Sequence, residues 1–255
     1  MGVKGRKSPS VKECIVSFLK ETGNPRLAVR MTCQQRKLKI KNLYISLFKI
    51  KIQDLQEGIE SISKIVENVD TLRVLFMLEK GTFGRKSISK NLSLGEGYVR
   101  KLLTRLEQKH MIRRSRKGTE LTGKGKRILN EIKKVLYPAG NIALNGYKNL
   151  YGVIVKNASR MVYKGLEERD EAIRLGARGA MVLTYEKGKL WFPSIECITD
   201  KYPEIDSAFR NGIKELEDGD VIIAAWSEKE LNAERGAFAA AILLAQKLGT
   251  KIKKI

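Results

Sequence analysis

The stretch that decides the fold of this chain is Ser93–Thr122, SLGEGYVRKLLTRLEQKHMIRRSRKGTELT. Ser93 and Glu96 have the spacing of a capping box, in which each side chain satisfies a backbone N–H at the start of a helix. The apolar residues that follow recur at helical spacing, which predicts a buried face formed by Val99, Leu102, Leu103 and Leu106. The pattern therefore predicts an amphipathic helix over residues 93–109.

Two short strands, Met111–Ser115 and Thr119–Leu121, flank a basic turn in the second half of this stretch. A glycine in so short a connection is typical of a β-hairpin. Thr122 then begins another helix. Upstream, the sequence predicts one helix over residues 70–79, capped by Asp70, and a short helix over residues 87–91. The predicted order is helix, helix, helix, hairpin, helix.

This order, over residues 59–137, resembles winged helix-turn-helix transcription regulators of the broad MarR-like type. It looks closest to archaeal winged-helix proteins that carry a C-terminal domain of unknown function. The resemblance implies that the 93–109 helix enters the major groove of duplex DNA and that the wing, residues 113–118, lies against the DNA backbone. The residues expected to contact DNA are Tyr98, Arg100, Lys101, Thr104, Arg105, Arg114, Arg116 and Lys117.

His110 departs from the pattern of this class, which more often has glycine where the helix ends. A residue at that position commonly adopts the left-handed conformation. Histidine tolerates this conformation at some energetic cost. The departure therefore concerns the helix cap and leaves the motif intact.

The distribution of charge independently favours a polyanion as the partner. The chain has 50 Lys and Arg against 28 Asp and Glu, a net charge of +22. Residues 1–58 carry +9 and residues 59–137 carry +11, whereas residues 138–255 carry only +2. Clustered cations are the electrostatic footprint of a nucleic-acid-binding domain. Charge alone does not separate duplex DNA from RNA or an anionic membrane, but the winged-helix pattern favours DNA.

Residues 1–58 form a basic leader without clear helix caps. Two functional interpretations are open: an arm that follows the DNA backbone, or an amphipathic segment that binds a partner. A further hypothesis is that the leader is disordered, or that the start codon was placed too far upstream and the natural chain begins near residues 53–58.

The composition excludes several classes of function. No apolar run approaches the roughly 18 residues of a membrane-spanning helix. The three cysteines are widely separated and lack CxxC spacing, so neither a disulfide framework nor a zinc site is predicted. His110 is the one histidine in the sequence, which excludes multi-histidine metal sites and Ser-His-Asp catalysis within one chain. We expect a cytoplasmic protein with no membrane partner, no metal, no cofactor and no catalytic residue.

Residues 138–255 predict a separate domain, because Pro138-Ala139-Gly140 breaks the preceding helix. Its predicted strands and helices follow the order β-α-β-β-α-β-α, over residues 150–156, 166–175, 180–185, 190–193, 205–216, 221–226 and 228–248. The first six elements match the ferredoxin-like split βαβ pattern. The expected fold class is therefore α+β, a winged helix followed by an α/β sandwich.

By analogy at the level of the fold alone, this second domain is expected to hold a homodimer and to sense a small-molecule effector. Its last helix contains the apolar run Ala237–Leu244, which serves either as the domain core or as a dimer interface. The expected effector cleft involves Arg178, Trp226, Ser227 and Arg235. Capping, tight turns and surface ion pairs remain the alternative explanation of these residues.

The sequence thus predicts a homodimeric transcription regulator that binds a specific duplex DNA sequence and is not an enzyme. Two alternatives stay open. One is a small-molecule enzyme with an autoregulatory winged helix. The other is a chromatin-type protein that binds DNA without sequence preference, which a specific-to-nonspecific affinity ratio would distinguish.

Overall fold

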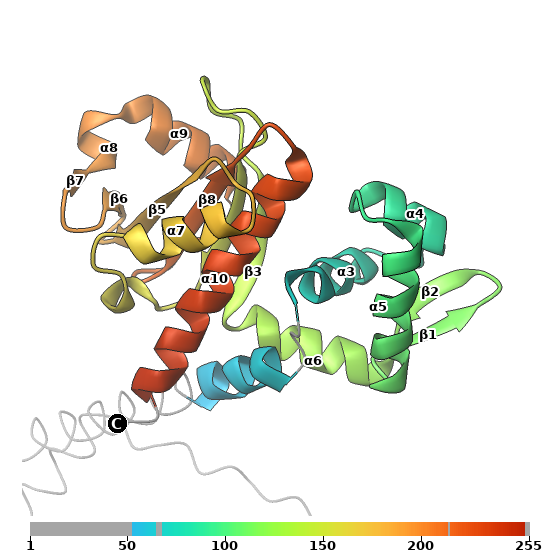
Figure 1. Ribbon diagram of the computed structural model, residues 1–255. Helices are drawn as coiled ribbons and strands as arrows, with labels where there is room; N and C mark the ends of the chain where they lie inside the picture. Colours follow the sequence, from blue (N-terminus) through green and yellow to red (C-terminus); the bar gives the residue numbers. More distant parts are fainter. Residues whose placement is uncertain (1–52, 65–67, 214, 253–255) are drawn as a thin grey trace, which may run out of the picture. The chain divides into compact units, whose positions relative to one another are not determined.

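The computed structural model describes residues 53–64, 68–213 and 215–252 of the chain. Residues 54–255 form one compact unit, with a helical N-terminal part and a sheet-rich C-terminal part (Figure 1). Most of the predicted leader lies outside the described residues, and its end belongs to a helix that includes residues 53–64. Every helix in the described ranges is too short or too polar to cross a membrane.

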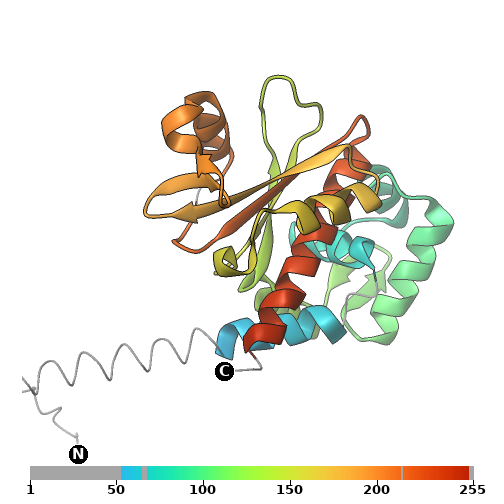
Figure 2. The ribbon, with the colours of Figure 1, turned by 60° about the vertical axis from the view of Figure 1, so that its left-hand side comes forward.

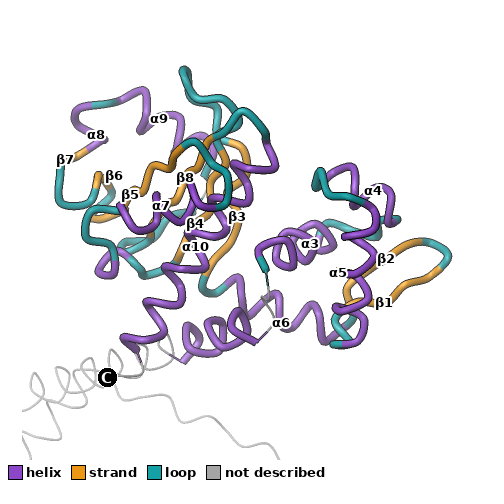
Figure 3. The backbone as a smooth tube through the Cα atoms, in the orientation of Figure 1, coloured by secondary structure: helices purple, strands orange, loops and turns teal. Residues whose placement is uncertain are grey.

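The N-terminal part contains four labelled helices and a two-stranded hairpin. In chain order these are α3 (Val69–Glu79), α4 (Arg85–Asn91), α5 (Glu96–Gln108), β1 (Ile112–Ser115), β2 (Gly118–Leu121) and α6 (Gly123–Lys133). The predicted order of helix, helix, helix, hairpin and helix is confirmed (Figure 3). Apolar residues from these helices form its core, including Leu72, Leu75, Ile88, Leu103 and Leu129.

The start of α3 differs from the sequence prediction. Asn68, not Asp70, caps the helix, because its Oδ1 accepts a hydrogen bond from the Thr71 backbone N–H at 3.1 Å. Asp70 lies inside the first turn and is only 2% exposed. Its carboxylate is thus available for side-chain partners instead of the helix end.

The predicted capping box at the start of α5 is also wrong. The helix begins at Glu96 with Gly95 as its N-cap and no side-chain cap. Ser93 has a φ of 52°, so it forms part of the tight connection from α4 and does not reach the helix. At the other end of α5, His110 has a φ of 58°, the left-handed conformation expected there.

Backbone packing fixes the hairpin against the helices. Strands β1 and β2 are antiparallel, with Ile112 opposite Leu121 and Ser115 opposite Gly118. Thr122 caps α6 as predicted, since its Oγ1 accepts from the Gly125 N–H at 3.0 Å. A Cβ atom on Gly125 would lie 2.0 Å from the Met111 carbonyl oxygen, so this approach of α6 to the hairpin requires glycine.

The C-terminal part contains a six-stranded sheet and its covering helices. The strands are β3 (Leu136–Asn141), β4 (Tyr151–Val155), β5 (Gly179–Glu186), β6 (Lys189–Phe192), β7 (Glu196–Cys197) and β8 (Val221–Trp226). The helices are η1 (Ser159–Met161), α7 (Leu166–Arg174), α8 (Ile198–Lys201), α9 (Pro203–Gly212) and α10 (Glu230–Ile252). The predicted order β-α-β-β-α-β-α is present as β4, α7, β5, β6, α9, β8 and α10, with additional elements between them.

The strand order of the sheet contradicts the ferredoxin-like prediction. The order is β3-β4-β8-β5-β6-β7, and every neighbouring pair is antiparallel. In a ferredoxin-like sheet the third strand of the predicted pattern lies between the first two, whereas in this sheet the fourth strand does. Here β8 lies between β4 and β5 and is antiparallel to both. The fold class is α+β, with a different topology from the one expected.

Strand β3 is not predicted by the sequence, because it contains Pro138 and Gly140. Proline lacks a backbone donor and is tolerated at the edge of a sheet or at a bulge. β3 is an edge strand, and its register shifts between Pro138 and Gly140. The segment expected to separate the two domains therefore belongs to the sheet, which begins at Leu136, shortly after α6 ends at Lys133.

Helices cover both faces of the sheet. Ile222 and Ala224 of β8 pack in one apolar cluster with Phe209 of α9. Since side chains alternate along a strand, the residues between them face the opposite side, where α7 and α10 contact the sheet (Figure 2). Burial on both faces explains why β8 reads as a continuous apolar run.

Candidate nucleic-acid interface

One face of α5 is buried and the other carries cations. Val99, Leu102, Leu103 and Leu106 are buried, as predicted. On the remaining face, Arg100, Lys101 and Arg105 are exposed and Thr104 is half-buried. Neither Arg100 nor Lys101 forms an ion pair within the described part of the chain. The two groups are therefore available to a ligand from outside.

The β1–β2 hairpin lies beside α5 and ends in a basic turn (Figure 1). Arg116 and Lys117 occupy the turn and are exposed, without a carboxylate partner among the described residues. Gly118 follows with a φ of 132°, and a Cβ atom there would lie 3.0 Å from the Phe83 backbone. The turn is held in place because the Phe83 N–H donates to the Thr119 carbonyl oxygen at 3.0 Å.

Arg114 differs from the other predicted contact residues because it already has a partner. Its Nε donates to Oε2 of Glu107 on α5 at 2.8 Å. This hydrogen bond raises the pKa of the Arg114 guanidinium and lowers that of the Glu107 carboxyl. Arg113 pairs in the same way with Glu120 across the hairpin. These pairs neutralise part of the hairpin's charge and leave its tip positive.

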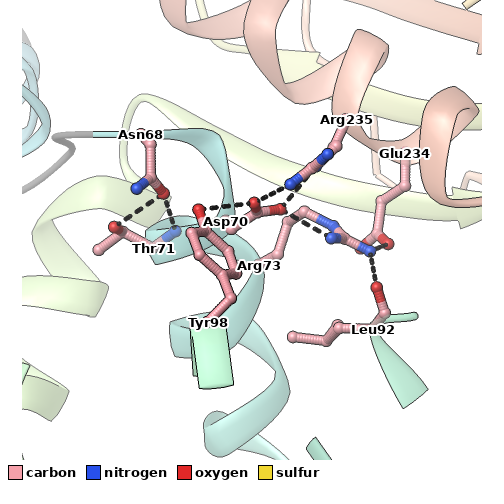
Figure 4. Close-up of polar contacts among 8 residues, drawn as sticks. All are labelled: Asn68, Asp70, Thr71, Arg73, Leu92, Tyr98, Glu234 and Arg235. Carbon is pink, nitrogen blue, oxygen red and sulfur yellow. Dashed lines mark hydrogen bonds and ion pairs between the residues drawn. The ribbon is translucent and has the colours of Figure 1, made fainter. Parts of the chain in front are cut away.

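Tyr98 is placed differently from the other predicted contact residues. Its hydroxyl donates to Oδ2 of Asp70 at 3.0 Å, while the side chain stays partly exposed (Figure 4). Burial raises the pKa of the Tyr98 hydroxyl, and the adjacent Asp70 charge raises it further. The first turn of α5 is thereby tied to α3.

Asp70 is the centre of a polar cluster that joins α3, α5 and α10. Arg235 of α10 donates from Nε to Asp70 Oδ1 at 2.9 Å and also bonds Oδ2. Arg73 of α3 donates from Nη1 to Asp70 Oδ1 at 2.8 Å and pairs with Glu234 of α10. We call Asp70, Arg73, Tyr98, Glu234 and Arg235 the Asp70 cluster (Figure 4).

The two arginines determine the charge state of Asp70. Burial alone would raise the pKa of this carboxyl, but the hydrogen bonds from Arg235 and Arg73 hold it below its ordinary value. The pairing in turn raises the pKa of Arg235. Sequence reasoning missed this cluster. The available signal was the pair of charged residues three apart, Asp70 and Arg73, in a mostly apolar helix.

The residues expected to form one effector cleft lie at two sites. At the C-terminal end of β8, the Arg178 N–H donates to the Trp226 carbonyl oxygen at 2.8 Å, and Ser227 Oγ donates to the Gly176 carbonyl oxygen at 3.3 Å. The Arg178 guanidinium pairs with Glu228 at 2.8 Å. Arg235 lies elsewhere, in the Asp70 cluster. The first three residues therefore make local structural contacts, and Arg235 belongs to a separate site.

A groove of about 620 Å³ opens beside the Asp70 cluster. Tyr98 and Arg235 line it, together with Arg174 of α7 and the apolar side chains of Ile242 and Leu243 on α10.

No group of three or more His, Cys, Asp or Glu side chains in the described ranges is placed to hold a metal ion. Cys197 is a buried free thiol.

Comparisons with known proteins match two separate segments of the chain. Residues 67–127 match the family model described as PH0730-like, N-terminal domain. Residues 147–244 match a domain of unknown function, DUF4443. No curated protein matches the chain.

One solved structure is similar over most of the chain. It is a hypothetical protein, PH0730, from Pyrococcus horikoshii OT3, with 37% sequence identity and a TM-score of 0.60. The similarity covers 73% of this chain and 97% of that one. Identity at this level over nearly the whole of the relative shows common descent. The chain therefore belongs to the family of the archaeal protein PH0730.

Proposed function

We propose that this protein is a transcription regulator that binds duplex DNA, and that residues 59–137 act as a winged helix. One observation supports the proposal above the others. Arg100 and Lys101 on α5, and Arg116 and Lys117 on the adjoining hairpin, are exposed cations with no carboxylate partner among the described residues. The net charge of +11 over residues 59–137 supports the same conclusion.

The two groups of cations have different proposed roles. A helix such as α5 presents its N-terminal residues to base edges in the major groove, so Arg100, Lys101, Thr104 and Arg105 would read sequence. The hairpin tip, with Arg116 and Lys117, would contact phosphates, which fix position without reading sequence. Tyr98 would contribute its exposed ring, because its hydroxyl is engaged by Asp70. Arg114 would join the phosphate contacts once released from Glu107.

We further propose that the protein acts in the cytoplasm as a homodimer. Regulators with this type of helix commonly bind two half-sites about one helical turn apart, so the symmetry of the DNA site mirrors that of the protein. The experiment is a measurement of molar mass by light scattering, followed by footprinting of the bound DNA. A monomer that protects a single half-site would contradict this part of the proposal.

The salt dependence of DNA binding tests the proposed role of the hairpin. Removing one cation that neutralises a phosphate should reduce the slope of log K against log salt by about 1. Arg116→Ala combined with Lys117→Ala should therefore reduce the slope by about 2 and weaken binding to all sequences alike. A suitable control is Lys187→Ala, which removes an exposed cation from the turn between β5 and β6.

Three outcomes are informative. A lower slope in the double variant with an unchanged slope in Lys187→Ala supports the proposal. An equal effect per cation removed in the two cases would mean that net charge alone drives binding. Absence of any binding to a pool of genomic duplex fragments at low salt would contradict DNA binding itself.

A further inference from the structure

The groove beside the Asp70 cluster has the features of a small-molecule site. Its volume, about 620 Å³, falls in the range of roughly 300–1,000 Å³ found for ligand pockets. Its lining comes from α3, the first turn of α5, α7 and α10. A ligand there would contact both the C-terminal part and the helix proposed to enter DNA.

The polar groups of the groove offer hydrogen-bond donors more than acceptors. The Asp70 carboxylate already accepts from Arg73, Tyr98 and Arg235. The Glu171 carboxylate is likewise engaged through both oxygens by Arg174, at 2.7 and 2.6 Å. A guanidinium has five N–H groups, and each of these carboxylates takes two from its arginine. Arg235 and Arg174 therefore keep donors for a further anion.

Apart from Asn68 and Gln246, the rest of the groove lining is apolar. Val69, Leu175, Ile242 and Leu243 line it and are each half-buried. Burying such surface against an apolar ligand is favourable by about 25 cal/mol per Å². An acceptor group near the two arginines and an apolar body along α10 together define the chemistry of the ligand.

We infer that this groove binds a small amphipathic anion, with its carboxylate or phosphate held by Arg235 and Arg174 and its hydrocarbon body against Ile242 and Leu243. The effect of this ligand on DNA binding rests on the proposed function. An anion bound through the remaining donors of Arg235 draws this guanidinium away from Asp70. The Asp70 carboxylate, which Arg235 orients, then shifts together with its hydrogen bond to Tyr98, the first turn of α5 is displaced, and affinity for DNA falls. Coupling between two sites is typically 5- to 150-fold.

The test uses the full chain and four probes that share one hydrocarbon chain. Octanoate and octyl phosphate carry anionic heads, octanol a neutral head and octylamine a cationic head. Calorimetry without DNA measures the affinity of each. Octanoate or octyl phosphate should bind at least tenfold more tightly than the other two, and their order identifies the carboxylate or the phosphate as the natural head. Equal binding of octanol and both anions would contradict recognition by the arginines.

Exposed positions provide variants that should fold. Gln246→Glu adds a negative charge to the groove at an exposed residue, and Arg174→Gln removes an exposed guanidinium. Both should weaken binding of the anionic probe by tenfold or more. Arg178→Gln, which removes an exposed arginine outside the groove, should leave it unchanged. Equal affinities in all three variants would place the ligand elsewhere and overturn the proposal.

A DNA-binding assay separates failure of this inference from failure of the proposed function. A saturating anionic probe should lower affinity for DNA about fivefold or more. If the protein binds DNA but none of the probes, the groove proposal is wrong and the proposed function stands. If it binds the anion but no DNA, the site stands and the proposed function is wrong. Binding of both without coupling would overturn the link through Asp70 and Tyr98.

Discussion

Arg235 and Asp70 lie 165 positions apart in the sequence, and the guanidinium of Arg235 donates to both carboxylate oxygens of Asp70. Asp70 is 2% exposed and Arg235 is partly exposed, so this pair joins α3 to α10 with its anion buried. Tyr98, in the first turn of α5, donates to the same carboxylate at 3.0 Å. The stability of the unit and the position of α5 thus depend on one buried anion.

Asp70→Asn should destabilise the protein strongly. The change leaves Arg73 and Arg235 without their shared anion, and removing one partner of a buried ion pair costs about 3–5 kcal/mol. Urea denaturation measures the free energy of unfolding. Asp170→Asn is the control, because Asp170 pairs with Arg169 at an exposed position, where such pairs are worth about 1 kcal/mol or less. Similar losses in the two variants would contradict the central place of Asp70.

The contribution of Asp70 to stability should disappear at acidic pH. Its pKa is lowered in the folded state, whereas the unfolded value is about 3.9. The folded state therefore binds the proton less readily, so stability from this group is present above the unfolded pKa and is lost as pH falls through the folded pKa. The difference in unfolding free energy between wild type and Asp70→Asn should stay constant from pH 7 to 5 and shrink below pH 4. A constant difference down to pH 3 would contradict this pairing.

Tyr98→Phe should separate the hydroxyl's structural contact from any role in DNA binding. Loss of the hydrogen bond to Asp70 should lower stability by about 1 kcal/mol. Because the hydroxyl is engaged by Asp70, affinity for DNA should change less than in Arg100→Ala. Thermal unfolding and fluorescence anisotropy measure the two effects. A large loss of sequence preference with unchanged stability would mean that the hydroxyl contacts a base.

Glu107→Gln should strengthen binding to DNA. The change releases Arg114 from its hydrogen bond with Glu107 and removes a negative charge beside the proposed phosphate contacts. An exposed ion pair is worth at most about 1 kcal/mol, so the gain should not exceed about fivefold. Glu228→Gln provides the comparison, since it releases Arg178 and Lys148, which lie outside α5 and the hairpin, with the same change in net charge. Equal gains in the two variants would point to net charge alone.

Gly125→Ala should disturb the junction of α6 with the hairpin. The added Cβ atom would lie 2.0 Å from the Met111 carbonyl oxygen, and overpacking of this kind typically costs about 1–3 kcal/mol. Gly123, in the same turn of α6, has open space at its Cβ position. Gly123→Ala should therefore leave stability unchanged or raise it slightly. If both variants are equally stable, the close approach described for Gly125 is wrong.

Local patterns in the sequence were sufficient for most of the N-terminal part. The helical spacing of Val99, Leu102, Leu103 and Leu106 predicts α5, and Thr122 predicts the start of α6. Capping was predicted less well, because Ser93 adopts a left-handed conformation that depends on how α4 packs before α5. The exposed cations of α5 and the hairpin follow directly from these patterns.

Nonlocal pairing accounts for what the sequence did not predict. The strand order of the sheet depends on β8 inserting between β4 and β5, and no spacing within a strand encodes that choice. β3 was missed because Pro138 and Gly140 oppose a strand everywhere except at an edge or a bulge. The Asp70 cluster joins residues from distant helices. Arg235 was predicted as an effector residue but was grouped with Arg178, Trp226 and Ser227, from which the fold separates it.

The most direct test of the central claim is selection of bound sequences from a random duplex pool, followed by anisotropy on the selected DNA at a fixed salt concentration. We predict that the protein selects a defined sequence. Arg100→Ala or Lys101→Ala should weaken binding to it by about 1–3 kcal/mol and relax selection at one base position, while Lys187→Ala retains affinity and preference. Recovery of no preferred sequence, with unchanged affinity in both α5 variants, would contradict the assignment of this helix as the reader of DNA sequence.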